Sequence, residues 1–324
     1  MMTVVIANPA ARAGKVGRQW GQLEATVERA LGPIEVRLTG HPGEATQLAR
    51  RAIQDGAERI AVVGGDGTLN EVVNGFFAEN GQLLGREVVL ALVPVGTGGD
   101  FSRSIGLCGV ELATAIERAT VHRIDLGRAE MVARDGSPVL RHFVNISSFG
   151  SSGLIVDMVN NTSKLLGAKA SFMWGTLKGL LQYRNQRIRL QVDDVCDEEM
   201  VVNTVAVANG RFFGGSMKIA PQAVLDDGLF DITVVGDIGL AEFLGANRRL
   251  YQGDILGVPG VRRLVGREIK ATPIGHAQVL IDLDGEQPGQ LPVTYRILPA
   301  ALQLLAPWGQ AEAGKPANPR ENAS

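Results

Sequence analysis

The sequence predicts an α/β protein: an N-terminal α/β domain with a parallel sheet, then a second, mostly antiparallel β domain. Three observations lead to this prediction. The chain has 324 residues, which is long for a single hydrophobic core. In the first third, β-branched apolar runs alternate with helical patterns and end in glycine turns. After residue 125, extended segments are joined by turn residues, which is typical of antiparallel strands.

The first domain, residues 1–125, is expected to alternate strands with helices. Apolar residues three and four positions apart indicate a helix, and short β-branched runs indicate a strand. Asp55-Gly56 ends the second helix, as turn residues do. The expected strands are 3–7, 34–39, 59–63 and 87–93, and the expected helices are 16–31, 43–54 and 112–119. This alternation predicts parallel pairing.

The second domain, residues 126–308, reads as extended segments separated by turns. Asp135-Gly136 lies between segments 124–133 and 139–147, and therefore predicts a hairpin. Further strands are expected at 187–195, 200–208, 230–235, 277–283 and 292–298, with one helical insertion at 154–183. Residues 309–324 contain no large apolar side chain. Burial there cannot offset the entropy of ordering, so a disordered tail is expected.

Composition excludes several classes of protein. Lys and Arg total 32 against 34 for Asp and Glu, so bulk charge does not favour nucleic acid. Cys108 and Cys196 have no second Cys or His at a zinc-finger spacing, which argues against a disulfide framework or a structural zinc site. No apolar run reaches the roughly 20 residues of a membrane span, and the N-terminus lacks the basic region of a signal peptide. A cytoplasmic protein without a transmembrane segment is expected.

Residues 62–71, VVGGDGTLNE, are the most informative stretch of the chain. An apolar strand ends there, glycines turn the chain, and Thr68 with Glu71 matches a T-x-x-E capping box, so a helix is expected to begin. Free amides at a helix start, approached through glycines, suit phosphate. Asp66 beside them fits a divalent cation between carboxylate and phosphate. The alternative is an ordinary glycine-rich turn.

Two common phosphate-binding patterns do not fit the sequence. The Walker A pattern requires Ser or Thr after its lysine, whereas Val16 follows Gly14-Lys15. The dinucleotide pattern G-x-G-x-x-G fails at Asn70. A second glycine turn, VGTGGDF at 95–101, follows the next strand. Both turns should therefore lie at the carboxyl edge of the sheet, where ligands bind.

Four motifs follow one another along the chain: GGDGTLNE at 64–71, VPVGTGGDF at 93–101, APQAVLDDGLF at 220–230 and DGE at 284–286. Their order resembles that in the bacterial diacylglycerol kinase-like lipid kinases, relatives of sphingosine and ceramide kinases. The resemblance covers about residues 3–306. It implies Mg-dependent transfer of the γ-phosphate of ATP to a lipid hydroxyl, diacylglycerol or a related lipid, in a cleft between the two domains.

The resemblance also implies roles for individual residues. Glu286 would accept the proton of the lipid hydroxyl with Asp284 beside it, while Asp66, Asp100 and Asp125 resemble the acidic network around Mg-ATP. A magnesium site in the second domain would use Asp227 and the main-chain carbonyls of Val224 and Leu229. The implied ATP contacts are Asn8, Pro9, Ala10, Ala11, Arg12, Thr39, Gly65, Asp66, Gly67, Thr68, Leu69, Asn70, Glu71 and Thr97.

The chain departs from the family pattern in two places. Gly99 stands where these kinases usually carry Asn before the Asp-Phe pair, and the first loop, residues 8–15, places its glycine later than N-P-x-x-G. Two other functions therefore stay open: an NAD kinase-like enzyme, and a non-catalytic regulator that binds a nucleotide or a lipid. Asn70-Glu71 inside the first motif favours the lipid kinase over the NAD kinase.

The expected partner is a lipid substrate at the membrane surface, and a homodimer stays open. Residues 158–192 contain no Asp or Glu but six basic residues, among them Lys164, Lys169 and Lys178. Met173, Leu177, Leu180 and Leu181 recur near helical spacing in the same segment. This pattern is typical of a helix that docks on the inner face of a membrane, or of a core-packed helix with a solvated basic face.

Overall fold

The computed structural model describes residues 1–93, 95, 99–152 and 184–307. Its N-terminal part contains the predicted parallel sheet, with strands in the order β2-β1-β3-β4. These strands are β1 (Thr3–Ala7), β2 (Ile34–Leu38), β3 (Arg59–Val63) and β4 (Val89–Val93). The apolar runs of β1, β3 and β4 are buried on both faces, as expected for strands covered by helices, whereas β2 at the edge of the sheet is only partly buried.

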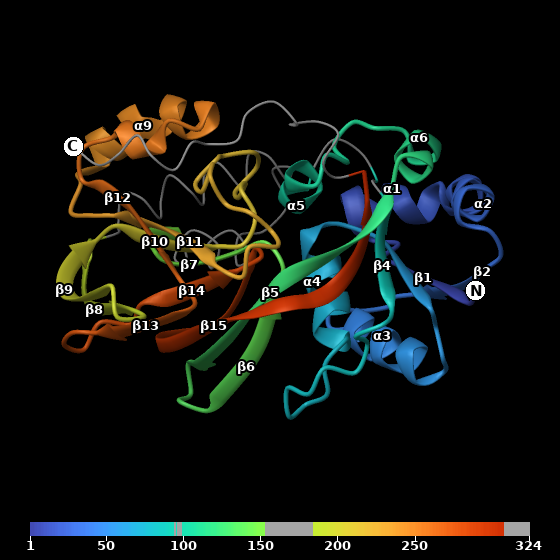
Figure 1. The fold of residues 1–324 in the computed structure, drawn as a ribbon, viewed down its shortest axis with the longest axis horizontal. Helices are drawn as coiled ribbons and strands as arrows, with labels where there is room; N and C mark the ends of the chain where they lie inside the picture. Colours follow the sequence, from blue (N-terminus) through green and yellow to red (C-terminus); the bar gives the residue numbers. More distant parts are fainter. Residues whose placement is uncertain (94, 96–98, 153–183, 308–324) are drawn as a thin grey trace.

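Helices cover both faces of this sheet (Figure 1). Ala49, Val72 and Val73 lie in one core with Val4 and Ile6, so α3 and α4 cover one face. Alternate strand residues face a second core formed with α1, α2 and α6. The helices are α1 (Ala11–Arg18), α2 (Trp20–Leu31), α3 (Glu44–Gln54), α4 (Asp66–Gly75) and α6 (Leu112–Glu117). The prediction of an α/β domain is confirmed.

The second part is mostly antiparallel, also as predicted. The Asp135-Gly136 turn joins two antiparallel strands, so the hairpin is confirmed. Its strands include β5 (Thr120–Val132), β6 (Pro138–Phe143), β7 (Ile146–Gly150), β8 (Gln186–Val192), β9 (Cys196–Val202), β10 (Thr204–Ala208) and β11 (Phe230–Val235). They continue with β12 (Val261–Gly266), β13 (Glu268–Pro273), β14 (Leu280–Leu283) and β15 (Glu286–Ala306).

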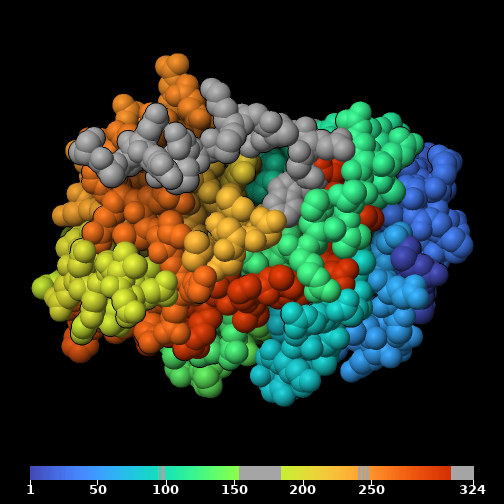
Figure 2. All heavy atoms as spheres, in the orientation of Figure 1, coloured from blue at the N-terminus to red at the C-terminus, as the bar shows by residue number. Residues whose placement is uncertain are grey.

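The last strand connects the two parts. β15 spans 21 residues, although the sequence predicted a strand only at 292–298. Its end, Gln303–Leu305, pairs in parallel with β4, and Leu302 and Leu304 enter the core of the first part, whereas Tyr295 lies in the core of the second. β5 runs antiparallel to β15 across the same junction. In Figure 2 these green and red segments lie between the blue and the yellow-orange halves. The division at residue 125 stays a prediction.

Other elements differ from the sequence reading. The helix expected at 16–31 is two helices that meet at Gln19, and the strand expected at 200–208 is β9 and β10, separated at Asn203. The two halves bond different partners, because β9 pairs with β8 whereas β10 pairs with β7 and β11. The sequence reading missed α5 (Asp100–Ser104), α9 (Leu240–Gln252), β12 and β13. Periodicity is a weak signal in segments as short as α5, β12 and β13, which have five or six residues each, but α9 has 13 residues and is not explained by its length.

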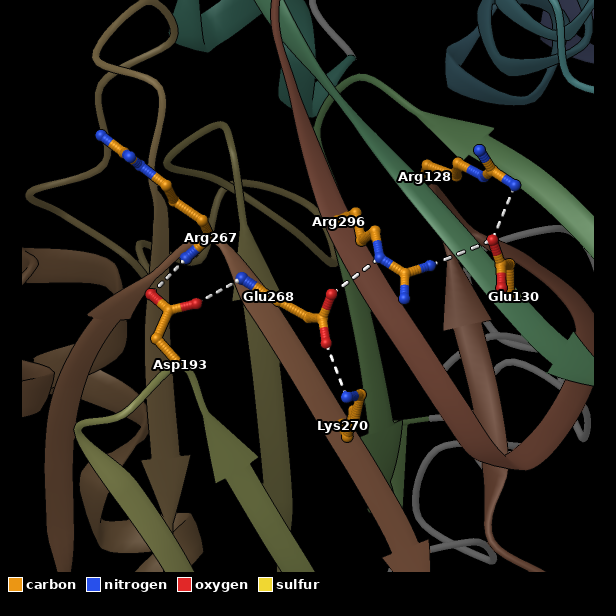
Figure 3. Close-up of polar contacts among 7 residues, drawn as sticks. All are labelled: Arg128, Glu130, Asp193, Arg267, Glu268, Lys270 and Arg296. Carbon is orange, nitrogen blue, oxygen red and sulfur yellow. Dashed lines mark hydrogen bonds and ion pairs between the residues drawn. The ribbon is translucent and has the colours of Figure 1, made fainter.

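A row of charged side chains ties β5, β15 and β13 together (Figure 3). Glu130 contacts Arg128 at 2.7 Å and Arg296 at 3.2 Å, and Glu268 contacts Arg296 and Lys270, both at 2.7 Å. The side chains are partly exposed, so each pair contributes roughly 0–1 kcal/mol. Because the row crosses three strands, it favours one register at the junction of the two parts.

Two sequence predictions lie outside the described residues: the helical insertion at 154–183 and the tail at 309–324. Most of the basic segment 158–192 lies there too, including its three lysines. Its last arginines are described. Arg187 and Arg189 on β8 pair with Glu199 and Asp197 on β9. Among the described residues, no helix combines the length and hydropathy needed to span a bilayer.

Candidate active site

A cavity of about 560 Å³ lies at the carboxyl edge of the parallel sheet, where the sequence predicted ligand binding. Most of the implied ATP contacts line it: Asn8, Ala10, Ala11, Arg12, Thr39, Gly65, Asp66, Gly67, Thr68 and Glu71. Glu286, from the far end of the chain, lines it as well. Pro9, Leu69 and Asn70 do not, and Thr97 lies outside the described residues. Gly40, His41 and Pro42 also line the cavity and carried no recognisable signal in the sequence.

The N-terminus of α4 opens into this cavity. Gly65 is its N-cap, and no side chain caps the first turn. The Thr68 hydroxyl instead accepts a hydrogen bond from Asn8 Nδ2 at 3.1 Å. The helix start therefore presents main-chain donors in a glycine-lined cavity, which suits a phosphate group.

Gly64→Ala should lower the melting temperature by several degrees. A Cβ at Gly64 would lie 2.5 Å from Thr68 Cβ, so the Thr68 side chain would have to move, at about 1–3 kcal/mol. Gly65→Ala is the matched control, because nothing lies within 4 Å of its Cβ position and its φ of −97° is ordinary. Equal melting temperatures for the two variants would show that the glycine turn accommodates a Cβ at Gly64 without loss of stability.

The capping-box prediction at Thr68 and Glu71 is wrong. The Glu71 carboxylate does not bond the start of its own helix; it accepts hydrogen bonds from Gly43 N at 2.8 Å and Ala45 N at 3.1 Å. These amides belong to the N-terminus of α3, where a negative charge is favourable. Glu71 therefore caps the neighbouring helix, a long-range partner that spacing along the chain cannot reveal.

Both departures from the family pattern lie at left-handed backbone. Gly99 has φ +118°, where a side chain such as Asn would be strained, and its Cβ would lie 3.0 Å from Ser102 Oγ. In the first loop, Arg12 and Ala13 both have φ +55° and are followed by Gly14 at +78°. Strained residues on a cavity wall are typical of binding sites.

Asp66 lies half-buried at the start of α4. Its Oδ2 accepts a hydrogen bond from Asp100 N at 2.9 Å, which ties the two glycine turns together. Burial, and then the nearby negative charge of Asp100, raise the pKa of the Asp66 carboxyl above its usual value. A divalent cation at this position would relieve that repulsion, so the residue fits the predicted metal-organising role.

The D-G-E turn places its two carboxylates in different environments. Glu286 is exposed to the cavity, and a Cβ on Gly67 would lie only 3.1 Å from its Oε1. Burial, and then repulsion from Glu71, raise the pKa of Glu286. Glu286 therefore lies against the first turn of α4, although it is more than 200 positions away along the chain.

Asp284 does not line the cavity and is 8% exposed. Its carboxylate accepts hydrogen bonds at 3.0–3.2 Å from Asn70 Nδ2 and from the main-chain amides of Val144, Asn145 and Ile146. Burial raises its pKa to about 6, and these donors oppose the shift. The structure therefore gives Asp284 the surroundings of a structural carboxylate and leaves Glu286 facing the cavity.

The sequence reading missed Asp282. This buried carboxylate accepts hydrogen bonds from Gly285 N at 2.9 Å and from Ser148 Oγ at 3.2 Å. Burial, and repulsion from Asp284 and Glu286, contribute to raising its pKa to about 7. The only available signal was the spacing D-x-D-G-E, in which a third acid precedes the motif by two residues.

Asp100 and Asp125 join the two parts of the molecule. The Asp100 carboxylate accepts hydrogen bonds from the amides of Gly215 and Ser216 at 2.9 and 2.7 Å. Asp125 accepts from the amides of Gly228 and Ala300, both at 2.7 Å. Of the predicted acidic network, the structure brings Asp100 to Asp66, whereas Asp125 lines a different cavity.

That second cavity, of about 520 Å³, contains the predicted magnesium ligand Asp227. Burial, and then repulsion from Asp125 and Asp226, raise the pKa of Asp227, so the surroundings favour a cation. Asp227 Oδ1 accepts a hydrogen bond from Leu229 N at 3.0 Å. The other two predicted ligands, Val224 and Leu229, do not line this cavity. In the described part of the chain, no group of three or more His, Cys, Asp or Glu side chains is arranged to hold a metal.

Comparisons with known proteins agree with this arrangement. Residues 2–129 match the diacylglycerol kinase catalytic domain. Residues 146–306 match the YegS C-terminal NAD kinase beta sandwich-like domain. Both cavities therefore lie within matched regions.

Relatives match along most of the chain. A probable lipid kinase YegS-like protein of Pseudomonas putida is 31% identical over 85% of this chain and 86% of its own length. The diacylglycerol kinase of Bacillus subtilis is 26% identical over 95% of this chain and 97% of its own. A crystal structure of a Bacillus anthracis protein assigned as a diacylglycerol kinase has a TM-score of 0.73 at 23% identity, over 94% of this chain and 95% of that one. The chain belongs to the bacterial diacylglycerol kinase-like family of lipid kinases.

Proposed function

We propose that this protein transfers the γ-phosphate of ATP, as its Mg²⁺ complex, to the hydroxyl group of diacylglycerol or a related lipid. One observation carries the proposal: Glu286, from the second part of the chain, faces the uncapped N-terminus of α4 across Gly67. A carboxylate and a phosphate site thus share one cavity. Such a pair suits the transfer of a phosphoryl group to an alcohol, because one group positions the phosphate and the other accepts the proton of the hydroxyl.

Each residue then has a defined task. The amides at the start of α4 hold the terminal phosphates, and the Arg12 loop closes the cavity beside them. Glu286 accepts the proton of the lipid hydroxyl while that oxygen forms a bond to the γ-phosphorus and the bond to ADP breaks. Mg²⁺ bound with ATP would supply positive charge at the phosphates, and Asp66 would help to orient it.

Parallel assays of phosphate transfer test the proposal. Radiolabelled γ-phosphate from ATP is offered, in separate reactions, to diacylglycerol, a sphingoid base, phosphatidylglycerol and NAD. We expect label in a lipid and none in NAD. Label in NAD alone would identify an NAD kinase-like enzyme. ATP binding without transfer to any acceptor would support a non-catalytic regulator.

Mg²⁺ should raise the melting temperature of the nucleotide-free protein, and Asp227→Ala should abolish that rise. Ligand binding to the folded state alone stabilises it, and removal of the Asp227 carboxylate removes the expected ligand. Asp226→Asn is the matched control, because it removes an adjacent charge and keeps Asp227 with its bond to Leu229. If Mg²⁺ does not change the melting temperature of the wild-type protein, the proposed magnesium site at Asp227 is wrong.

A further inference from the structure

We propose that Asn70 is a positioning residue that ties helix α4 to the D-G-E turn and so holds Glu286 against the phosphate site. The inference rests on the proposed function, in which Glu286 is the base. It differs from what the family resemblance implied for Asn70, which was a contact to ATP.

The contacts of Asn70 define this role. Its Nδ2 donates to Asp284 Oδ2 at 3.0 Å and to the main-chain oxygen of His142 at 3.1 Å. Asn70 is the one described side chain that donates to the Asp284 carboxylate, since the three other donors are main-chain amides. The bond spans 214 positions of the sequence and joins the first half of the chain to the turn that carries Glu286.

The geometry of the turn explains why the Asn70–Asp284 bond can affect the position of Glu286. Asp284 has φ +50° and Gly285 φ +90°, so the chain reverses within two residues before Glu286. A residue in this conformation persists only when its surroundings hold it. The four hydrogen bonds to the Asp284 carboxylate keep the turn in this conformation. Of the four donors, Asn70 is the one that belongs to α4, the helix proposed to bind phosphate.

A nucleotide contact by Asn70 does not fit its surroundings. The residue is 6% exposed and does not line the cavity that contains Asn8, Gly65 and Glu286. Both hydrogens of its amide are already used, and its Oδ1 accepts from Asn74 Nδ2 at 3.2 Å. Only a primary amide of this length donates twice and accepts once here, which explains why Asn stands at this position.

Steady-state kinetics separate the two roles. Asn70→Ala should lower kcat for the lipid about 10- to 100-fold, because a misplaced base loses alignment with the hydroxyl. The KM for ATP should stay within about twofold. Asn74→Ala is the matched control: it removes an amide from the next turn of the same helix, which bonds His142 and Asn70 Oδ1, but it leaves the bond from Asn70 Nδ2 to Asp284 in place. Its kcat should stay close to that of the wild type.

Two outcomes would overturn the inference. A higher KM for ATP at unchanged kcat in Asn70→Ala would assign Asn70 to the nucleotide. Unchanged kcat and KM would show that the bond is dispensable. If Asn70→Ala does not fold, Asn70→Asp takes its place, because it keeps the volume and removes the donor.

Asn70→Asp also gives a readout that a purely structural role would not change. At pH 8 two carboxylates would face each other, whereas near pH 6 the pair would share a proton and regain a donor. The kcat of this variant relative to wild type should therefore rise as the pH falls. Asp66, Asp282 and Glu286 are the other acids near this pair, and all are retained in both proteins. A ratio that does not change with pH would contradict the proposed bond.

A measurement without turnover keeps this inference distinct from the proposed function. Melting temperatures of Asn70→Ala, Asp284→Ala and the double variant form a cycle, because each single change removes one partner of the bond. We expect the double variant to lose less than the sum of the two single losses, because the two side chains share one bond. Additive losses would overturn the Asn70–Asp284 coupling even in a protein that phosphorylates lipid. If the losses in melting temperature are not additive but the protein phosphorylates no lipid, the Asn70–Asp284 coupling is supported and the proposed function is wrong.

Discussion

Asp66→Asn should lower the rate of phosphate transfer by about 10³-fold, and Asp66→Ala should abolish it. The side chain lies at the helix start that is proposed to bind the phosphates, in a cavity where few other charges are available to orient Mg²⁺. Loss of a group that stabilises developing charge commonly costs about 10²- to 10³-fold, and loss of metal orientation adds to that. Activity measured over a range of Mg²⁺ concentrations checks the prediction.

The Asn variant separates charge from structure. The amide oxygen of Asn can still accept the hydrogen bond from Asp100 N, so the contact between the two glycine turns should persist. Its melting temperature should therefore stay near that of the wild type. Near-normal turnover of Asp66→Asn at saturating Mg²⁺ would contradict the proposed role of the carboxylate.

Glu286→Gln should lower kcat by roughly 10²- to 10⁴-fold while the KM for ATP stays nearly constant. A glutamine fills the same space but accepts no proton from the acceptor hydroxyl. Three carboxylates line the described part of the cavity. Glu71 is bonded to two amides at the N-terminus of α3 and Asp66 to an amide of α5, whereas the Glu286 carboxylate has no hydrogen bond in this part of the cavity.

The pH dependence gives a second check on Glu286. A base must be ionised to act, so wild-type kcat should fall as the pH drops through the pKa of Glu286, which lies above its ordinary value. The residual activity of Glu286→Gln should lack this acidic limb. Equal turnover of the two proteins would assign the base elsewhere. Asp284 would not be the replacement, because its carboxylate is buried and bonded to four donors.

Local patterns in the sequence predicted much of the fold. Three strands lie at their predicted bounds: Thr3–Ala7, Arg59–Val63 and Phe230–Val235. A β-branched run bounded by turn residues indicates a strand through neighbouring residues alone, so no distant contact is needed to predict it. The glycine turn at Gly64 was predictable for the same reason. By contrast, the division of 200–208 into β9 and β10 depends on which strands each half pairs with, and no local pattern records that.

The sequence by itself determined that two glycine turns and a D-G-E motif occur in one chain, and that the chain resembles lipid kinases. The resemblance implied that Glu286 is the proton acceptor, but only the tertiary structure decided which acid of that motif lines the cavity. Asp284 and Glu286 are two positions apart, so their spacing in the sequence does not show which carboxylate is exposed to the cavity. The left-handed turn at Asp284 and Gly285 buries one carboxylate against Asn70 and exposes the other beside Gly67. Burial and hydrogen-bond donors set the chemistry of a carboxylate, and both come from residues far away along the chain.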